Sequence, residues 1–157
     1  MYLLGGGMEE LDEKDLAILR LLQRDARTPA SVIAQRIGVP ENTVRFRMRR
    51  LVERGVIRGF VALVDPRKVG LSVSAAFMIK LDPERREEAI NELRGWEEIV
   101  NIYQFSGEYD LIAVAFVKGL AELQSLIDKV KGVKGVRETN VLVTTRVIKA
   151  QSVFSLQ

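Results

Sequence analysis

The sequence predicts an α+β protein with an N-terminal helix-turn-helix domain, winged-helix-like in plan. A β-linker joins it to a C-terminal ferredoxin-like βαββαβ domain. Residues 11–54 hold three short stretches with apolar residues at helical spacing, and the third stretch is strongly basic. Residues 72–147 instead repeat a strand–helix–strand pattern. A length of 157 residues by itself favours a single domain. The change of pattern between the two regions is therefore the evidence for two domains.

Strong start signals predict a first helix from about residue 12 to residue 24. Asp12 is a good N-cap and Asp15 stands three residues later, the spacing of a capping box. Leu11 and Leu16 occupy the positions of a hydrophobic staple. The expected buried stripe is Ile18, Leu19 and Leu22.

A second helix is expected to open at Thr28-Pro29, with Thr28 as its cap and Pro29 in its first turn. Gly38 ends it in the left-handed conformation. Its expected buried face is Val32, Ile33 and Ile37.

The third helix is expected over residues 41–54 and has two unlike faces. At 100° per residue, one face collects Val44, Met48, Leu51 and Val52. The other face carries Asn, Thr and Arg side chains. In the major groove of DNA, Arg pairs with guanine and Asn with adenine, whereas Thr contacts phosphate or the thymine methyl group. Two short helices followed by such a helix form a helix-turn-helix layout, which predicts nucleic-acid binding. The candidate DNA-binding residues are Asn42, Thr43, Arg45, Phe46, Arg47, Arg49 and Arg50.

The positive charge is concentrated on this helix. Residues 42–52 hold four Arg and no acidic residue, whereas residues 61–157 hold 13 basic and 13 acidic residues. A basic stripe is typical of a surface that binds a polyanion, although it is also compatible with a solvated helix face. Phe46 has two interpretations: packing against a neighbouring element or subunit, or contact with a thymine methyl group.

After Gly55 the pattern changes. Residues 56–64 are rich in β-branched side chains and predict a strand that Asp65-Pro66 ends. The predicted boundaries are 8–55 for the helix-turn-helix domain, 56–71 for the linker and 72–150 for the second domain. Met1–Gly7 is expected to be a loose tail, with Met8 as an alternative start.

The second domain is predicted to contain strands over 73–81, 99–105, 110–117 and 136–147. One helix is expected to follow Asp82-Pro83, and a second is expected to begin near Leu120. The halves match at an offset of 37, which pairs Phe77 with Val114, Ile79 with Phe116, Ile90 with Ile127, Leu93 with Val130 and Ile99 with Val136. We expect an antiparallel sheet with both helices on one face. The other, apolar face then predicts self-association.

Two absences narrow the function. The chain has no Cys and no His, which excludes disulfides, thiolate chemistry, cysteine-ligated zinc and the commonest general base. The longest apolar run, Leu111–Val117, is far shorter than the roughly 20 residues of a membrane span, and no secretory signal is evident. We therefore expect a cytoplasmic protein that is not an enzyme, with no metal, no cofactor and no membrane partner. The composition is also typical of a heat-adapted or GC-rich source.

Several motifs together resemble one family. LDEKDLAILRLLQRDAR and IAQRIGVPENTVRFRMRRLVERGVI are similar to the DNA-binding domain of the Lrp/AsnC regulators of bacteria and archaea. VDPRKVGL resembles their linker, and GEYDLIAVAFV with GVRETNVLV their ligand-binding (RAM) domain. The resemblance covers about Leu11 to Lys149. It implies a sequence-specific transcription regulator of double-stranded DNA, in which homodimers formed through the sheets assemble into octamers or related oligomers. An amino acid or related small molecule would tune it.

The recognition helix departs from the family pattern at three positions. Arg47 matches the usual Arg, but Pro40 replaces a Ser cap and Glu41 replaces Pro or a small residue. Phe46 stands where a polar residue is common. These departures affect the operator sequence rather than the fold.

The resemblance also implies an effector site between subunits, near the GxYD turn and the last strand. Asp110 could accept an ammonium group, and backbone N–H groups near Gly107 could hold a carboxylate. The alternative is a tight turn next to ordinary strand residues. The candidate effector-binding residues are Gly107, Tyr109, Asp110, Thr139, Val141 and Thr144.

Two other functions stay open at this stage. One is an architectural DNA-binding protein with low sequence specificity, which phosphate contacts alone would support. The other is a metabolic sensor or enzyme built on the second domain, for which Asp110, Tyr109 and Lys80 are the only candidates for chemistry. No pair of these residues has a recognisable catalytic spacing.

Overall fold

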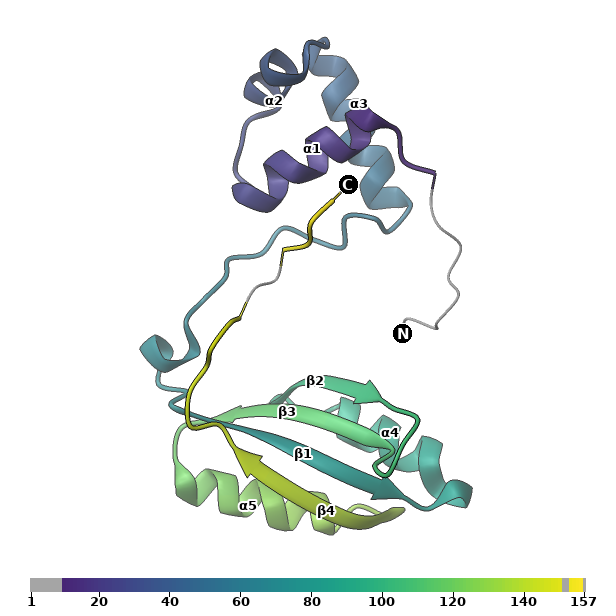
Figure 1. Ribbon diagram of the computed structural model, residues 1–157, viewed down its shortest axis with the longest axis vertical. Coiled ribbons are helices and arrows are strands. Elements are labelled where there is room, and N and C mark those ends of the chain that lie inside the picture. The colour runs from purple at the N-terminus through teal and green to yellow at the C-terminus, as the bar shows by residue number, and fades with distance from the viewer. Residues whose placement is uncertain (1–9, 151–152, 157) are drawn as a thin grey trace. The chain divides into compact units, whose positions relative to one another are not determined.

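The computed structural model describes residues 10–150 and 153–156, and the chain divides into two compact units (Figure 1). Unit 1 comprises the chain up to Ala62 together with the segment from Ala150 onward, and unit 2 is Leu63–Lys149. Unit 1 is helical, whereas unit 2 combines a four-stranded sheet with helices. The predicted α+β class is therefore confirmed. The predicted loose tail and the alternative start at Met8 lie outside the described residues.

Unit 1 contains α1 (Glu13–Arg24), α2 (Ala30–Ile37) and α3 (Glu41–Glu53). The predicted capping box is confirmed, because the Asp12 side chain accepts the Asp15 N–H at 2.8 Å and the Asp15 side chain accepts the Asp12 N–H. Gly38 ends α2 at φ 67°. The three helices share one core, centred on Ile18, Ile33, Val44 and Leu51.

Three details of the predicted helices are wrong. Thr28 does not cap α2, because its hydroxyl donates to the Asp25 carbonyl at 2.7 Å and Pro29 precedes the helix. Ala34 is buried in α2, whereas Val32 is only half-buried. Val52 is exposed because it lies about 80° from Val44, at the edge of the apolar face of α3.

The predicted strand over residues 56–64 does not form. Ile57 packs into the unit 1 core and its N–H donates to the Leu51 carbonyl, but residues 58–64 are exposed or nearly so. β-Branched composition favours a strand only where a neighbouring segment supplies hydrogen bonds and packing, and this segment pairs with none in the described chain. Asp65 then caps a short 3-10 turn over Pro66–Val69.

Unit 2 contains a sheet in the order β2-β3-β1-β4 with every neighbour antiparallel, as the βαββαβ plan requires. Its helices, α4 and α5, both pack on one face of the sheet (Figure 1). The elements are β1 (Val73–Leu81), α4 (Arg86–Arg94, after a 3-10 turn over Pro83–Arg85), β2 (Ile99–Gln104), β3 (Leu111–Val117), α5 (Leu120–Lys131) and β4 (Val136–Val143).

Alternation along the two central strands decides which side chains form the core. Every second residue from Ala75 to Leu81 and from Leu111 to Val117 is buried, as expected for a sheet covered on one face. These residues meet the buried side of α4 and α5, formed by Ala89, Leu93, Leu123, Leu126 and Val130.

The offset of 37 holds for the helices and for Ile99 with Val136, which both pack in the core, but it is wrong for β1 and β3. Leu93 and Val130 are equivalent core positions, but Phe77 faces the helices while Val114 lies on the opposite face. Because side chains alternate with a period of two, an odd offset moves a strand residue to the other face. α5 begins at Leu120 as expected. One further expectation is wrong, because β4 ends at Val143 rather than residue 147.

Candidate DNA-binding and ligand-binding sites

One side of α3 faces solvent and carries the chemistry predicted for base contacts. Asn42, Arg45 and Arg49 are exposed, and the Phe46 side chain is 61% exposed. The spacing of these residues places them on one helical stripe. Phe46 is therefore not part of the core of unit 1.

Two of the predicted arginines are instead tied to α1. Arg47 Nη1 lies 2.8 Å from Asp15 Oδ1 and 2.7 Å from Asp12 Oδ2. Arg50 Nη2 lies 2.9 Å from Asp15 Oδ2. Asp15 is fully buried, so its charge is balanced almost entirely by these two guanidinium groups.

This cluster has a structural role that the sequence pattern did not predict. Arg47 and Arg50 hold α3 against α1, and only part of each guanidinium remains available to an outside partner. The Asp15 N–H bond to Asp12, followed by the Arg47 guanidinium, lowers the pKa of Asp12. One sequence signal could have revealed the cluster. Asp12 and Asp15 stand at the start of α1, and α1 must pack against the basic helix α3.

The structure also accounts for Glu41, an acidic residue at the start of a helix proposed to approach phosphates. Its carboxylate accepts a hydrogen bond from Arg45 Nε at 2.9 Å, one helical turn away. The pair is neutral, so Glu41 does not add uncompensated negative charge to this surface. Arg49 forms no ion pair within residues 10–150 and 153–156, which makes it the exposed arginine of α3 with its charge uncompensated.

The turn before β3 is anchored by Asp110. Its Oδ2 accepts the Leu81 N–H at 2.8 Å, and its Oδ1 accepts a hydrogen bond from Arg86 Nη2 at 2.6 Å. Both oxygens therefore have protein partners. Each oxygen keeps a further lone pair, so acceptance of an ammonium group by Asp110 stays a prediction. Asp110 also joins the end of β1 to the start of α4.

Lys80 connects the same turn to β4. Its ammonium group lies 3.0 Å from Glu138, 3.3 Å from Glu108 and 5.1 Å from the centre of the Tyr109 ring. Glu138, more than the opposing desolvation, raises the pKa of Lys80. Gly107 and Tyr109 are thus placed at the end of the sheet where β4 begins.

The other candidate effector residues do not gather at this turn. Thr139 and Val141 pair with Ile79 and Phe77 and therefore face the helices. Val141 packs against the core, and the Thr139 hydroxyl is buried without a hydrogen-bond partner. Thr144 lies at the far end of β1, where its N–H donates to the Ser74 carbonyl.

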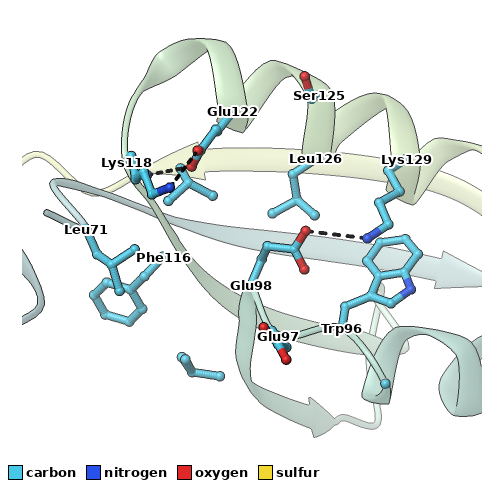
Figure 2. Close-up of a pocket in the computed structure, with 13 residues that line it drawn as sticks. Leu71, Trp96, Glu97, Glu98, Phe116, Lys118, Glu122, Ser125, Leu126 and Lys129 are labelled. Carbon is cyan, nitrogen blue, oxygen red and sulfur yellow. Dashed lines mark hydrogen bonds and ion pairs between the residues drawn. The ribbon is translucent and has the colours of Figure 1, made fainter.

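A surface pocket of about 790 Å³ opens at the opposite end of β3, between α5 and the loop that precedes β2 (Figure 2). Four of its charged groups are paired: Lys129 lies 3.4 Å from Glu98 and 4.0 Å from the Trp96 ring centre, and Lys118 pairs with Glu122. Glu97 also lines the pocket and forms no ion pair within the described residues. The pocket is separate from the Gly107–Asp110 turn.

Comparison with known proteins places these sites in a family. Residues 11–58 match a family described as winged helix-turn-helix DNA-binding, and residues 74–154 match the Lrp/AsnC ligand binding domain. An HTH-type transcriptional regulator of Pyrococcus horikoshii is 40% identical over 141 residues, which cover 89% of each chain. The chain belongs to the Lrp/AsnC family. It is therefore an HTH-type transcriptional regulator with a ligand-binding domain, and it is not an enzyme.

Two further comparisons agree with this assignment. An HTH-type transcriptional regulator of Methanocaldococcus jannaschii is 37% identical over 140 residues, covering 88% of this chain and 95% of that protein. The crystal structure of a Neisseria meningitidis transcriptional regulator in complex with L-Met has a TM-score of 0.87 at 23% identity. It covers 93% of this chain and 97% of that one. At that identity the likeness concerns the fold. Across the described residues, no helix has the length and apolarity needed to cross a membrane.

Proposed function

We propose that this Lrp/AsnC regulator binds specific sequences in double-stranded DNA through the exposed stripe of α3. The observation that carries the proposal is the combination of Asn42, Phe46 and the uncompensated Arg49 on one solvent-facing stripe. Amide, apolar and guanidinium groups are the ones that distinguish base pairs in the major groove. Arg47 and Arg50 would act mainly by fixing the orientation of α3, and Thr43 and Arg45 would contact phosphates or bases at its edges.

We also propose that the regulator is a homo-oligomer built through the open face of the sheet, with dimers that assemble further into octamers or related forms. This face carries Met78, Ile112 and Val114 at its centre, with Tyr103 and Leu142 more than half exposed. Within the described residues, no helix covers it. A contiguous apolar surface of this kind favours association with a second copy, and paired copies would present two α3 helices to two half-sites.

We further propose that an amino acid or a related small molecule tunes this regulator near the Gly107–Asp110 turn. The crystal structure of the Neisseria protein, which has the same fold, is that of its complex with L-Met. Because Asp110 is already bonded to Leu81 and Arg86, ligand recognition would rest on the exposed backbone at Gly107 and on a second subunit.

A selection from random duplex DNA tests the DNA-binding proposal. The full chain should enrich a pseudo-palindromic motif whose half-sites are separated by about 10–10.5 base pairs or a multiple. Arg49→Ala should cost about 1–3 kcal/mol on the selected site and relax the preference at one position of each half-site. The matched control, Arg94→Ala, removes an exposed positive charge from unit 2 and should leave the motif unchanged. Recovery of no motif, or of the same motif with Arg49→Ala, would contradict the proposal.

A further inference from the structure

The segment Val153–Leu156 lies along α1 although it is distant in sequence. Gln23 Oε1 accepts the Phe154 N–H at 2.6 Å, and Gln23 Nε2 donates to the Phe154 carbonyl at 3.3 Å. Arg20 Nε donates to the Leu156 carbonyl at 3.0 Å. Arg20 and Gln23 are three residues apart and therefore share one face of the helix. Together they satisfy backbone groups of an extended segment much as a neighbouring strand would.

The side chains of Leu156 and Phe154 differ in burial. Leu156 packs against the helical core of unit 1, whereas the Phe154 ring is 80% exposed. Leu156 thus contributes apolar contact, and Phe154 contributes only its backbone. An apolar anchor combined with backbone hydrogen bonds is a common way to recognise a peptide.

We propose that this surface of α1, which we call the α1 dock and define by Arg20, Gln23 and the adjoining core around Leu156, is a binding site for the chain's own segment 153–156. The chain passes from unit 1 to unit 2 after Ala62 and returns after Lys149. The docked segment therefore attaches the ligand-binding unit to the DNA-binding unit at a second point. A second attachment restricts the orientations that the single linker would allow.

The consequence for regulation rests on the proposed function. The docked segment follows β4 along the chain, so a ligand bound near β4 would change how favourably the segment docks on α1. The same helix carries Asp15, which holds Arg47 and Arg50 of the recognition helix. Docking thus gives the chain a second attachment between the two units, and its release would leave only the linker between them.

Hydrogen exchange of the full chain tests the docking directly. The Phe154 amide should be protected, and Gln23→Ala or Leu156→Ala should each speed its exchange by about fivefold or more, since each removes a contact of ordinary strength. Phe154→Ala and Gln35→Ala are the controls, and after correction for intrinsic rates they should leave the protection unchanged. An unprotected amide in the wild type, or full protection in Gln23→Ala, would overturn the proposal. Protection that disappears on dilution to monomers would assign the docked segment to a second copy and would also overturn it.

A DNA measurement then tests the effect of docking and keeps the two proposals apart. On the selected site, inserting about five base pairs between the half-sites turns them to opposite sides of the duplex. The wild type should lose at least about tenfold in affinity, whereas Leu156→Ala should lose much less while still binding a single half-site. Equal losses would refute the coupling. If no duplex is bound specifically, the proposed function fails, and the exchange data alone decide whether the α1 dock is occupied.

Discussion

Replacing Asp15 by Asn tests the buried cluster that positions the recognition helix. The substitution keeps the shape of the side chain but removes the charge facing two guanidinium groups, at 2.8 Å and 2.9 Å. A hydrogen bond to a charged group contributes roughly 1.5–3 kcal/mol, and breaking one partner of a buried pair costs roughly 3–5 kcal/mol. Since the side chains of Arg47 and Arg50 stay 18% and 39% exposed, water replaces part of the loss. We expect a cost near the lower end, about 3 kcal/mol.

This cost is large for a helical unit of this size. A core of fewer than about 70 residues rarely supplies more than 3–5 kcal/mol, so Asp15→Asn should bring unit 1 close to its unfolding midpoint. The two units can be followed separately, because the single tryptophan of the chain, Trp96, lies in unit 2. Urea titration should show an early loss of helical circular dichroism, while the Trp96 fluorescence transition keeps its wild-type midpoint.

The matched control is Asp25→Asn, which removes an exposed carboxylate paired with Arg27. Surface pairs contribute little, so this variant should lie within about 0.5 kcal/mol of the wild type. If Asp15→Asn behaves like Asp25→Asn, the buried cluster does not hold α1 and α3 together. A shift of the Trp96 transition by the same amount would instead show that the two units unfold together.

Three further results are expected. The pKa of Asp12 is lowered in the folded protein by the hydrogen bond from the Asp15 N–H and by Arg47. The contribution of Asp12 to stability is therefore complete above its unfolded pKa of about 3.9 and is lost as the pH falls through its lower folded pKa. Asp12→Asn should make the free energy of unfolding, measured by urea titration at several pH values, less dependent on pH in the acid range. Gly135→Ala should destabilise unit 2 by about 2–5 kcal/mol in the Trp96 transition, because Gly135 has φ 94° and a Cβ would lie 2.8 Å from the Arg85 Cβ; a loss below about 1 kcal/mol would contradict this. Leu142→Asp should weaken self-association by about tenfold or more in sedimentation, because association would bury a carboxylate against apolar surface; an unchanged oligomer would place the contact elsewhere.

Local signals in the sequence predicted most of the fold. Asp12 with Asp15 marked the start of α1, Gly38 marked the end of α2, and alternation from Val73 to Leu81 identified β1 and its buried face. Each signal depends on neighbours within a few residues. The strand predicted over residues 56–64 failed because a strand depends on a partner that composition does not reveal.

The position of the candidate DNA-binding surface could be predicted from the sequence. Which of its arginines are exposed and which form ion pairs within the protein could not. Helical angles placed the candidate residues on or beside the polar face of α3. They could not show that Arg47 and Arg50 form ion pairs with Asp15, which lies 32 and 35 residues earlier. Asp15 already had a local explanation as part of the capping box. Contacts at such separations become visible only when the helices are packed together, as is also true of the contact between Gln23 and Phe154.

The central claim is that α3 reads base sequence, and the most direct measurement is fluorescence anisotropy on two duplexes across a salt series. One duplex is the DNA upstream of the chain's own gene or the site obtained by selection, and the other is a scrambled duplex of the same composition. At physiological salt, we expect the wild type to bind the first at least about 10³-fold more tightly, with the gap persisting as salt rises. Equal affinities that fall in parallel with salt would contradict the claim and would identify an architectural protein that contacts phosphates alone.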